Sequence, residues 1–172
     1  VAGLAAALGA GAMTNSINEI EKSGCILVIG SNTTGQHPII SGRIMRAKVN
    51  GAKLIVIDPR RIPLSQYADI YAQIRPGTNV ALANGLLHLL IEKDLLDQDF
   101  IRERTEGFEE ITAKVKEYTP EAVSRITGIA PETLEAIALA YGQADTAMIL
   151  YAMGITQHLT GTDHVKALSN LA

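Results

Sequence analysis

The chain has 172 residues, the length of one domain, and a chain of this length buries enough apolar surface to fold without disulfides or metals. We therefore expect a single domain over residues 1–172. Its 15 basic and 18 acidic residues give a net charge of -3, with no basic stripe or aromatic platform of the kind that nucleic acid requires. We therefore expect no nucleic acid as a partner. No apolar run approaches the roughly 18 residues that cross a membrane, so we expect no membrane span either.

The only cysteine, Cys25, cannot form an internal disulfide or a cysteine metal cluster, and we expect it to be a small buried apolar residue. The chain begins with Val1 rather than a methionine and ends at Ala172 inside a helical pattern, so we expect a fragment of a longer protein. No signal-peptide pattern occurs, which favours a cytoplasmic location, although a targeting signal can be lost from a fragment.

Two short helices are predicted before the first apolar run. Residues 1 to 8 favour a helix that ends at the glycine-containing turn 9–11. Thr14 or Asn15 is then placed to cap a second helix, with Ile17 and Ile20 on one apolar face.

The stretch from Cys25 to Arg60 predicts a parallel βαβ unit. Two runs rich in Val and Ile, at 25–30 and at the start of 53–60, flank a polar loop at 31–37 and an amphipathic helical pattern at 38–50. A right-handed crossover brings the polar loop and the Asp58-Pro59-Arg60 turn to the same edge of the sheet. Open α/β sheets bind their ligands at that edge.

The rest of the chain repeats the arrangement of strand, polar loop and helix. Residues 67–74 predict a short third strand, and Thr78 is placed to cap a helix over 79–93. Four further helices are predicted at 97–105, 107–117, 120–126 and 131–141. Residues 147–153 predict a fourth, buried strand that ends at Gly154, followed by a polar run at 155–162 and a helix from about Asp163.

This order of elements predicts an α/β protein with a three-layer Rossmann-like fold, a mainly parallel sheet and an extra helical segment at 97–142. The loops after all four strands are expected to open on one edge. Loops that precede helices offer unpaired backbone N–H groups and the positive end of a helix dipole, which suits phosphates. A nucleotide is therefore the first ligand class to consider.

The two commonest nucleotide motifs are absent. Gly30 and Gly35 have the spacing of a phosphate-binding loop, but Gln36 and His37 follow where Lys and Ser or Thr are required. The G-x-G-x-x-G fingerprint is also missing. Asp58 lies where a ribose-binding acid is expected, and an aspartate at a strand end can equally be a turn residue.

Metal and nucleophile sites are not indicated. The four histidines, at 37, 88, 158 and 164, have no metal-ligand spacing, and no G-x-S-x-G motif occurs. We expect His88 to serve helix packing or the surface. His158 follows a strand-ending glycine, so it is placed either for a ligand or for a structural role. We assign no catalytic and no metal-binding residue.

Six stretches, which together cover nearly the whole chain, carry a family resemblance. They are GAMTNSINEI (11–20), LVIGSNTTGQHPI (27–39), NGAKLIVIDPR (50–60), RPGTNVAL (75–82), DQDFIRERTEGF (97–108) and MGITQH (153–158). In this order they resemble the catalytic subunit of molybdenum or tungsten formate dehydrogenases, within the molybdopterin oxidoreductase family.

The resemblance implies a parent protein that oxidises formate to carbon dioxide in a two-electron reaction. It further implies a bis(molybdopterin guanine dinucleotide) centre with molybdenum or tungsten, and a [4Fe-4S] cluster bound outside this segment. The metal-binding cysteine or selenocysteine and the cluster ligands of the family have no match here, so the fragment alone is not expected to be active. Partners are expected to be the remaining domains of the subunit and electron-transfer subunits.

Within that family this segment is the Rossmann-like domain that holds one guanine dinucleotide. The resemblance assigns binding roles to residues in all four loops, namely Gly30, Ser31, Asn32 and His37; Asp58, Pro59 and Arg60; Gly77, Thr78 and Asn79; and Gly154, Thr156, Gln157 and His158. Many relatives in the wider superfamily carry Asp in place of Asn79. The amide has one acceptor oxygen, and its NH2 group would oppose the N–H donors of guanine.

Two other interpretations stay open at this point. The chain can be the nucleotide module of another enzyme, such as the central domain of a thiamine-diphosphate enzyme, which also contains a βαβ unit. It can also be a non-catalytic domain whose segment 97–142 binds a partner subunit. The upstream coding sequence distinguishes the first interpretation from formate dehydrogenase, because cluster cysteines followed by a Cys-His or selenocysteine-His pair belong only to the latter.

Overall fold

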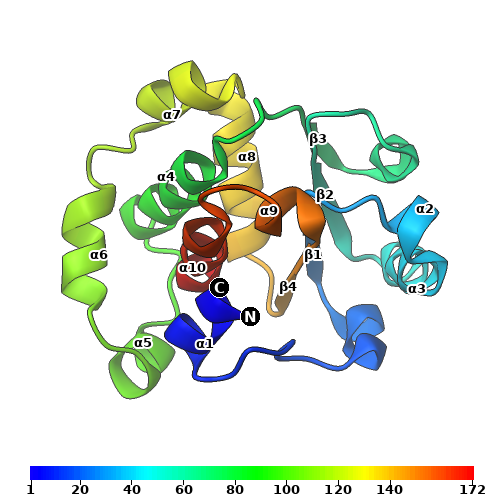
Figure 1. Ribbon diagram of the computed structural model, residues 1–172, viewed down its shortest axis with the longest axis horizontal. Coiled ribbons are helices and arrows are strands. Elements are labelled where there is room, and N and C mark those ends of the chain that lie inside the picture. The colour runs from blue at the N-terminus through cyan, green and yellow to red at the C-terminus, as the bar shows by residue number, and fades with distance from the viewer.

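Four parallel strands form the centre of the fold, in the order β3-β2-β1-β4 (Figure 1). The computed structural model describes residues 1–172. The strands are β1 (Cys25–Ile29), β2 (Lys53–Ile57), β3 (Ile70–Ala72) and β4 (Ala147–Tyr151). Because β1 and β2 lie inside the sheet, with helices over both faces, their continuous Val and Ile runs are almost completely buried.

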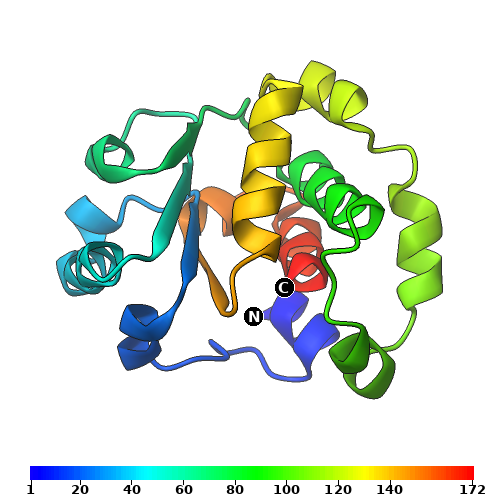
Figure 2. The same cartoon turned by 180° about the vertical axis from the view of Figure 1, so that it is seen from behind.

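Helices cover the two faces of the sheet and make the fold three-layered (Figures 1 and 2). On one face, Ile26 and Val28 of β1 pack in a cluster with Ile44 of α3 (Pro38–Val49) and Ile20 of η1, a 3-10 helix at Ile17–Lys22. On the other face, Leu27 and Ile29 pack in the larger cluster. That cluster is built from α4 (Asn79–Glu92), α8 (Pro131–Gly142) and α10 (Gly161–Leu171).

The extra helical segment runs around the outside of α4 (Figure 1). Within the predicted segment 97–142, the helices on the outside are α5 (Gln98–Arg104), α6 (Phe108–Val115) and α7 (Pro120–Thr127), whereas the last helix, α8, packs in the larger core cluster. Val115 and Val123 anchor this segment in the larger core cluster. The first helix, α1 (Ala2–Leu8), packs against α10, where Gly3 lies directly against Val165. No helix of the chain is both long and apolar enough to cross a membrane.

The predicted three-layer α/β fold and its parallel βαβ unit are confirmed. Several local predictions were wrong. The second helix has Ser16 as its N-cap residue rather than Thr14 or Asn15, and the backbone N–H of Ser16 donates to Oε2 of Glu19 at 3.0 Å. That helix is a 3-10 helix, in which Ile20 is buried but Ile17, at its first position, is 40% exposed.

Strand lengths and exposures also differ from the prediction. The third strand covers only Ile70–Ala72, because the preceding η2 (Pro63–Tyr67) is a 3-10 helix that includes Tyr67. The fourth strand is only half-buried, since β4 lies at an edge of the sheet. Short helices also occupy two predicted loops, α2 (Thr33–Gln36) and α9 (Met153–Thr156). The last helix begins at Gly161 rather than near Asp163.

Two helical glycines give a matched test of the packing between α4 and α7. A Cβ atom at Gly85 would lie 2.6 Å from Cγ2 of Val123, whereas at Gly42 in α3 the nearest atom is the terminal Nη1 of Arg46, 3.8 Å away. Alanine favours a helix over glycine by about 1 kcal/mol, and overpacking a core costs about 1–3 kcal/mol. We expect Gly42→Ala to raise the free energy of unfolding and Gly85→Ala to lower it.

Chemical denaturation of both variants measures these changes. Adding Val123→Ala to Gly85→Ala should recover part of the loss, because the smaller side chain makes room for the new methyl group. Equal stabilisation by the two alanines would contradict the close packing of α4 on α7.

Candidate functional site

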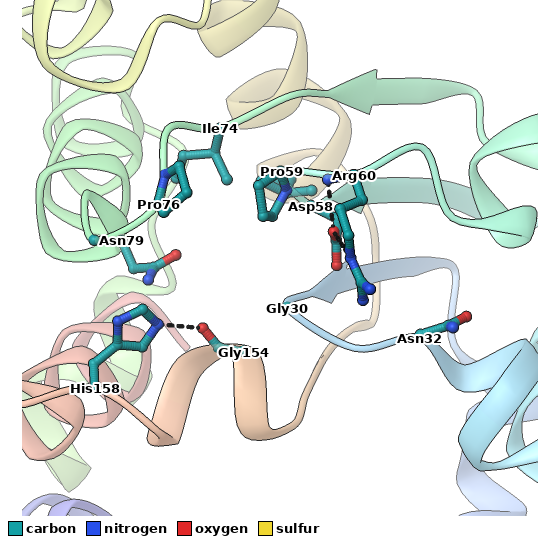
Figure 3. A pocket seen from close by; sticks show the side chains of 12 residues that line it. Gly30, Asn32, Asp58, Pro59, Arg60, Ile74, Pro76, Asn79, Gly154 and His158 are labelled. Atoms are coloured by element: carbon teal, nitrogen blue, oxygen red, sulfur yellow. Dashed lines mark hydrogen bonds and ion pairs between the residues drawn. The ribbon is translucent and has the colours of Figure 1, made fainter.

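A cavity of about 260 Å³ lies at the carboxyl ends of the strands. Its wall takes residues from all four strand-end loops (Figure 3). The 12 lining residues are Gly30, Asn32, Ile57, Asp58, Pro59, Arg60, Ile74, Pro76, Gly77, Asn79, Gly154 and His158. This position is the topological switch point of the sheet, because the chain leaves β1 toward α3 on one face and leaves β4 toward α10 on the other.

Gly30 and Gly154 form the floor of the switch point through a direct backbone contact. The N–H of Gly154 donates to the carbonyl oxygen of Gly30 at 3.1 Å. A Cβ atom at Gly154 would lie 2.6 Å from that oxygen, and Gly30 has a φ of +58°. Only glycine fits both requirements. The loops after β1 and β4 therefore touch through backbone atoms, with no side chain between them and the cavity.

The turn after β2 places a buried acid beside an exposed cation. Asp58 is 4% exposed, and its Oδ1 accepts from the backbone N–H of Arg60 at 2.8 Å. The Arg60 side chain is 73% exposed, with Nε 3.8 Å from Oδ1 of Asp58. Figure 3 shows its guanidinium hanging toward the loop after β1. Asp58 therefore holds the turn, while the guanidinium of Arg60 stays largely open to solvent.

Neighbouring side chains fix the backbone of this turn. The hydroxyl of Tyr71 donates to the carbonyl of Asp58 at 3.3 Å, and Nε2 of Gln73 donates to the carbonyl of Pro59 at 2.9 Å. Burial, together with the nearby Asp58 carboxylate, raises the pKa of Tyr71. The phenol therefore stays protonated at neutral pH and keeps its donor role.

The opposite end of the cavity is formed by Asn79 and His158 (Figure 3). Asn79 is 7% exposed and begins α4, after Gly77 with a φ of +84°. Nε2 of His158 donates to the carbonyl of Gly154 at 2.9 Å, which fixes the turn formed by α9. Thr78 was predicted to cap α4, but its hydroxyl donates to the carbonyl of Arg75 at 2.7 Å instead.

Five residues assigned by the resemblance do not line the cavity. They are Ser31, His37, Thr78, Thr156 and Gln157. Ser31 is buried, whereas Thr156, the last residue of α9, and Gln157, directly after it, are exposed. His37 is exposed at the start of α3. Asn32 does line the cavity, but Figure 3 shows its carboxamide turned away from the centre, and its Oδ1 is buried without a partner.

Sequence reasoning missed the apolar wall of the cavity, which consists of Ile57, Ile74 and Pro76. Two of these residues lie next to predicted site residues, since Ile57 precedes Asp58 and Pro76 precedes Gly77. No group of three or more His, Cys, Asp or Glu side chains is arranged to hold a metal ion. Burial raises the pKa of Cys25 to about 11, so its thiol is protonated and unreactive at neutral pH.

This fold and cavity define a Rossmann-like α/β domain with a polar crevice at the switch point of its sheet. The chain belongs to the molybdopterin oxidoreductase family, because the model of that family matches residues 4–172. Membership implies a molybdopterin cofactor with molybdenum or tungsten. The family and the fold predicted from the sequence are both confirmed.

Individual relatives agree with this assignment. The alpha subunit of the F420-dependent formate dehydrogenase from Methanocaldococcus jannaschii is 55% identical over 100% of this chain and 26% of that protein. F420-dependent formate dehydrogenase 1 subunit alpha from Methanococcus maripaludis is 51% identical over the same shares. The structure of acetylene hydratase from Pelobacter acetylenicus matches with a TM-score of 0.82 and 27% identity, over 90% of this chain and 23% of that chain. The chain spans about a quarter of the length of the curated relatives it matches.

The backbone contact at the switch point can be tested with Gly154→Ala. The added methyl group would meet the backbone of Gly30 rather than a movable side chain. We expect a loss of about 1–3 kcal/mol in the free energy of unfolding. The neighbouring Met153 is 59% exposed, so Met153→Ala should change the same quantity by less than about 0.5 kcal/mol. Unchanged stability of Gly154→Ala would show that the two loops lie further apart than this structure has them.

Proposed function

We propose that this chain binds one guanine dinucleotide of a bis(molybdopterin guanine dinucleotide) cofactor in the catalytic subunit of a formate dehydrogenase. The observation that carries the proposal is the cavity at the switch point. There the contact between Gly30 and Gly154 leaves no room for a side chain, and the guanidinium of Arg60 is 73% exposed, with only a 3.8 Å contact to Asp58. Backbone that cannot carry a side chain allows close approach of a pyrophosphate, and an exposed guanidinium offers paired donors to it.

The residues around the cavity have separate roles in this proposal. Arg60 pairs with the pyrophosphate, and its fork of N–H donors suits two phosphate oxygens at once. Asp58 uses Oδ1 to hold its own turn, which leaves its second carboxylate oxygen to accept a ribose hydroxyl or a guanine N–H. Gly77 presents backbone at the third loop, and Gly154 and His158 close the fourth. Gln157, directly after α9, offers both donor and acceptor groups to the pterin.

The remaining assigned residues contribute more locally. Ser31, Asn32 and His37 belong to the loop and short helix between β1 and α3, and Pro59 shapes the turn that carries Arg60. Thr78 fixes the loop before α4 through its bond to Arg75. Thr156 lies on α9 next to Gln157.

The formate dehydrogenase alpha subunits at 51% and 55% identity support formate as the substrate of the whole protein. When bound, the molybdenum or tungsten centre would supply a two-electron acceptor for formate oxidation, and a [4Fe-4S] cluster held elsewhere would supply onward electron transfer. Cys25, the only cysteine here, is buried in β1 and cannot ligate either centre. We therefore expect residues 1–172 to act as one cofactor-binding domain that is inactive alone. It would work with other domains and electron-transfer subunits in the cytoplasm.

Calorimetric titration of the purified chain with GDP tests the binding role. GDP carries the base, ribose and pyrophosphate of the proposed ligand, so saturable binding is expected. Arg60→Ala should raise the dissociation constant for GDP by about 10- to 100-fold, because a hydrogen bond to a charged group contributes about 1.5–3 kcal/mol. Asp58→Ala should also weaken binding, whereas Asp58→Asn keeps an oxygen for the turn and should weaken it less.

The matched control is Arg104→Ala, which removes the same charge from the exposed end of α5, away from the cavity. This variant should bind GDP as the unchanged chain does. Absence of saturable binding, or equal affinities for Arg60→Ala and Arg104→Ala, would overturn the proposed role of the cavity.

A further inference from the structure

His164 is a buried polar side chain that the proposed function does not use. It lies on α10, behind the end of the cavity formed by Asn79 and His158, and is 1% exposed. Its Nδ1 is 3.0 Å from the carbonyl oxygen of Ile155, and its Nε2 is 3.1 Å from Oγ1 of Thr160. The ring of His158 packs against it with the centroids 4.8 Å apart.

These partners determine which ring nitrogen carries the proton. A carbonyl oxygen can only accept, so the 3.0 Å contact requires an N–H on Nδ1. A neutral imidazole then has an acceptor at Nε2, which the hydroxyl of Thr160 satisfies by donating. Both nitrogens are therefore satisfied in the neutral ring, and no charge has to be buried.

The proton on Nδ1 has a consequence for Asn79. The carboxamide of Asn79 places Nδ2 3.4 Å from Nδ1 of His164, which sets two donors against each other. Figure 3 shows its oxygen on the cavity side. Rotating the carboxamide by half a turn keeps its shape and turns the NH2 group into the cavity. It also brings the oxygen to the N–H of His164, which then forms a three-centre hydrogen bond shared with the carbonyl oxygen of Ile155. No other group of the chain bonds to either end of this carboxamide, so the rotation breaks nothing.

We propose that His164 is a positioning residue that holds the NH2 group of Asn79 toward the cavity, so that this end selects a ligand oxygen that accepts a hydrogen bond. The inference rests on the proposed function for the identity of the ligand. In a guanine nucleotide that oxygen belongs either to a phosphate or to the carbonyl of the base. In this inference Asn79 donates a hydrogen bond to the ligand, whereas an aspartate at this position would accept one, since a carboxylate can only accept.

The first test uses the free chain, so it does not depend on ligand binding. Nitrogen-15 NMR of the histidine side chains distinguishes the two neutral tautomers. His164 should show its proton on Nδ1. A proton on Nε2 would overturn the inference, whether or not the chain binds a nucleotide.

The second test is the affinity of Asn79→Asp for GDP. If the NH2 group of Asn79 donates to a ligand oxygen, the carboxylate replaces a donor with a charged acceptor, and affinity should fall by about 10-fold or more. If the oxygen of Asn79 faces the base instead, the carboxylate would accept from guanine N–H groups. Affinity for GDP would then be kept or increased, which contradicts the proposal.

Two further ligands identify the oxygen. If it belongs to a phosphate, the effect of Asn79→Asp should disappear with guanosine and persist with ADP. If it is the base carbonyl, the effect should persist with guanosine and disappear with ADP. An equal loss with all three ligands would mean that the variant only disturbs the cavity, and would overturn the assignment.

Variants of His164 test its own role. The measured quantity is the fold-loss of GDP affinity when Asn79→Asp is added to each chain. His164→Leu removes the N–H that orients Asn79, so this fold-loss should be smaller in the His164→Leu chain. His164→Asn keeps a side-chain N–H near the position of Nδ1, so the fold-loss should be larger there than in the His164→Leu chain. Thr162→Val, an exposed threonine at the start of the same helix, is the control and should leave it unchanged. If adding Asn79→Asp costs equal affinity in the His164→Leu and Thr162→Val chains, His164 does not position Asn79.

Discussion

The backbone contact between Gly30 and Gly154 is the constraint on which the carboxyl edge of the sheet depends. Each glycine follows a central or edge strand of the parallel sheet, and a side chain on either would meet the backbone of the other. The contact therefore joins the loops after β1 and β4 at the point where the chain turns to opposite faces of the sheet. The contact is made by backbone atoms of two glycines, so no side chain from these positions occupies the space at the switch point, and the cavity stays open.

Charge and polarity are arranged around that contact in a consistent way. The buried carboxylate of Asp58 bonds to its own turn, so the neighbouring guanidinium of Arg60 is not neutralised by a close bidentate pair. Asn79 and His158 supply the polar groups at the other end, where His158 donates to the carbonyl of Gly154 and Asn79 lies beside His164. One end is thus suited to an anion and the other to directional hydrogen bonds.

The sequence predicted the central architecture because β1, β2 and α3 follow strong local patterns of burial. It did not predict the short helices α2 and α9, or the exposure of β4, since an apolar run does not show whether a strand lies at the edge of its sheet. The strand-end rule placed Gly30, Asp58 and Gly154 at one edge, but it could not identify the apolar wall. The contact of Asn79 with His164 joins residues 85 positions apart, so no local pattern indicates it.

The most direct measurement of the central claim is an NMR titration of the nitrogen-15-labelled chain with GDP. The account predicts that the backbone amides of Gly30, Arg60, Gly77 and Gly154 shift together and give one dissociation constant, because a single ligand spans all four strand-end loops. Shifts confined to one loop, or located away from the carboxyl edge of the sheet, would contradict it.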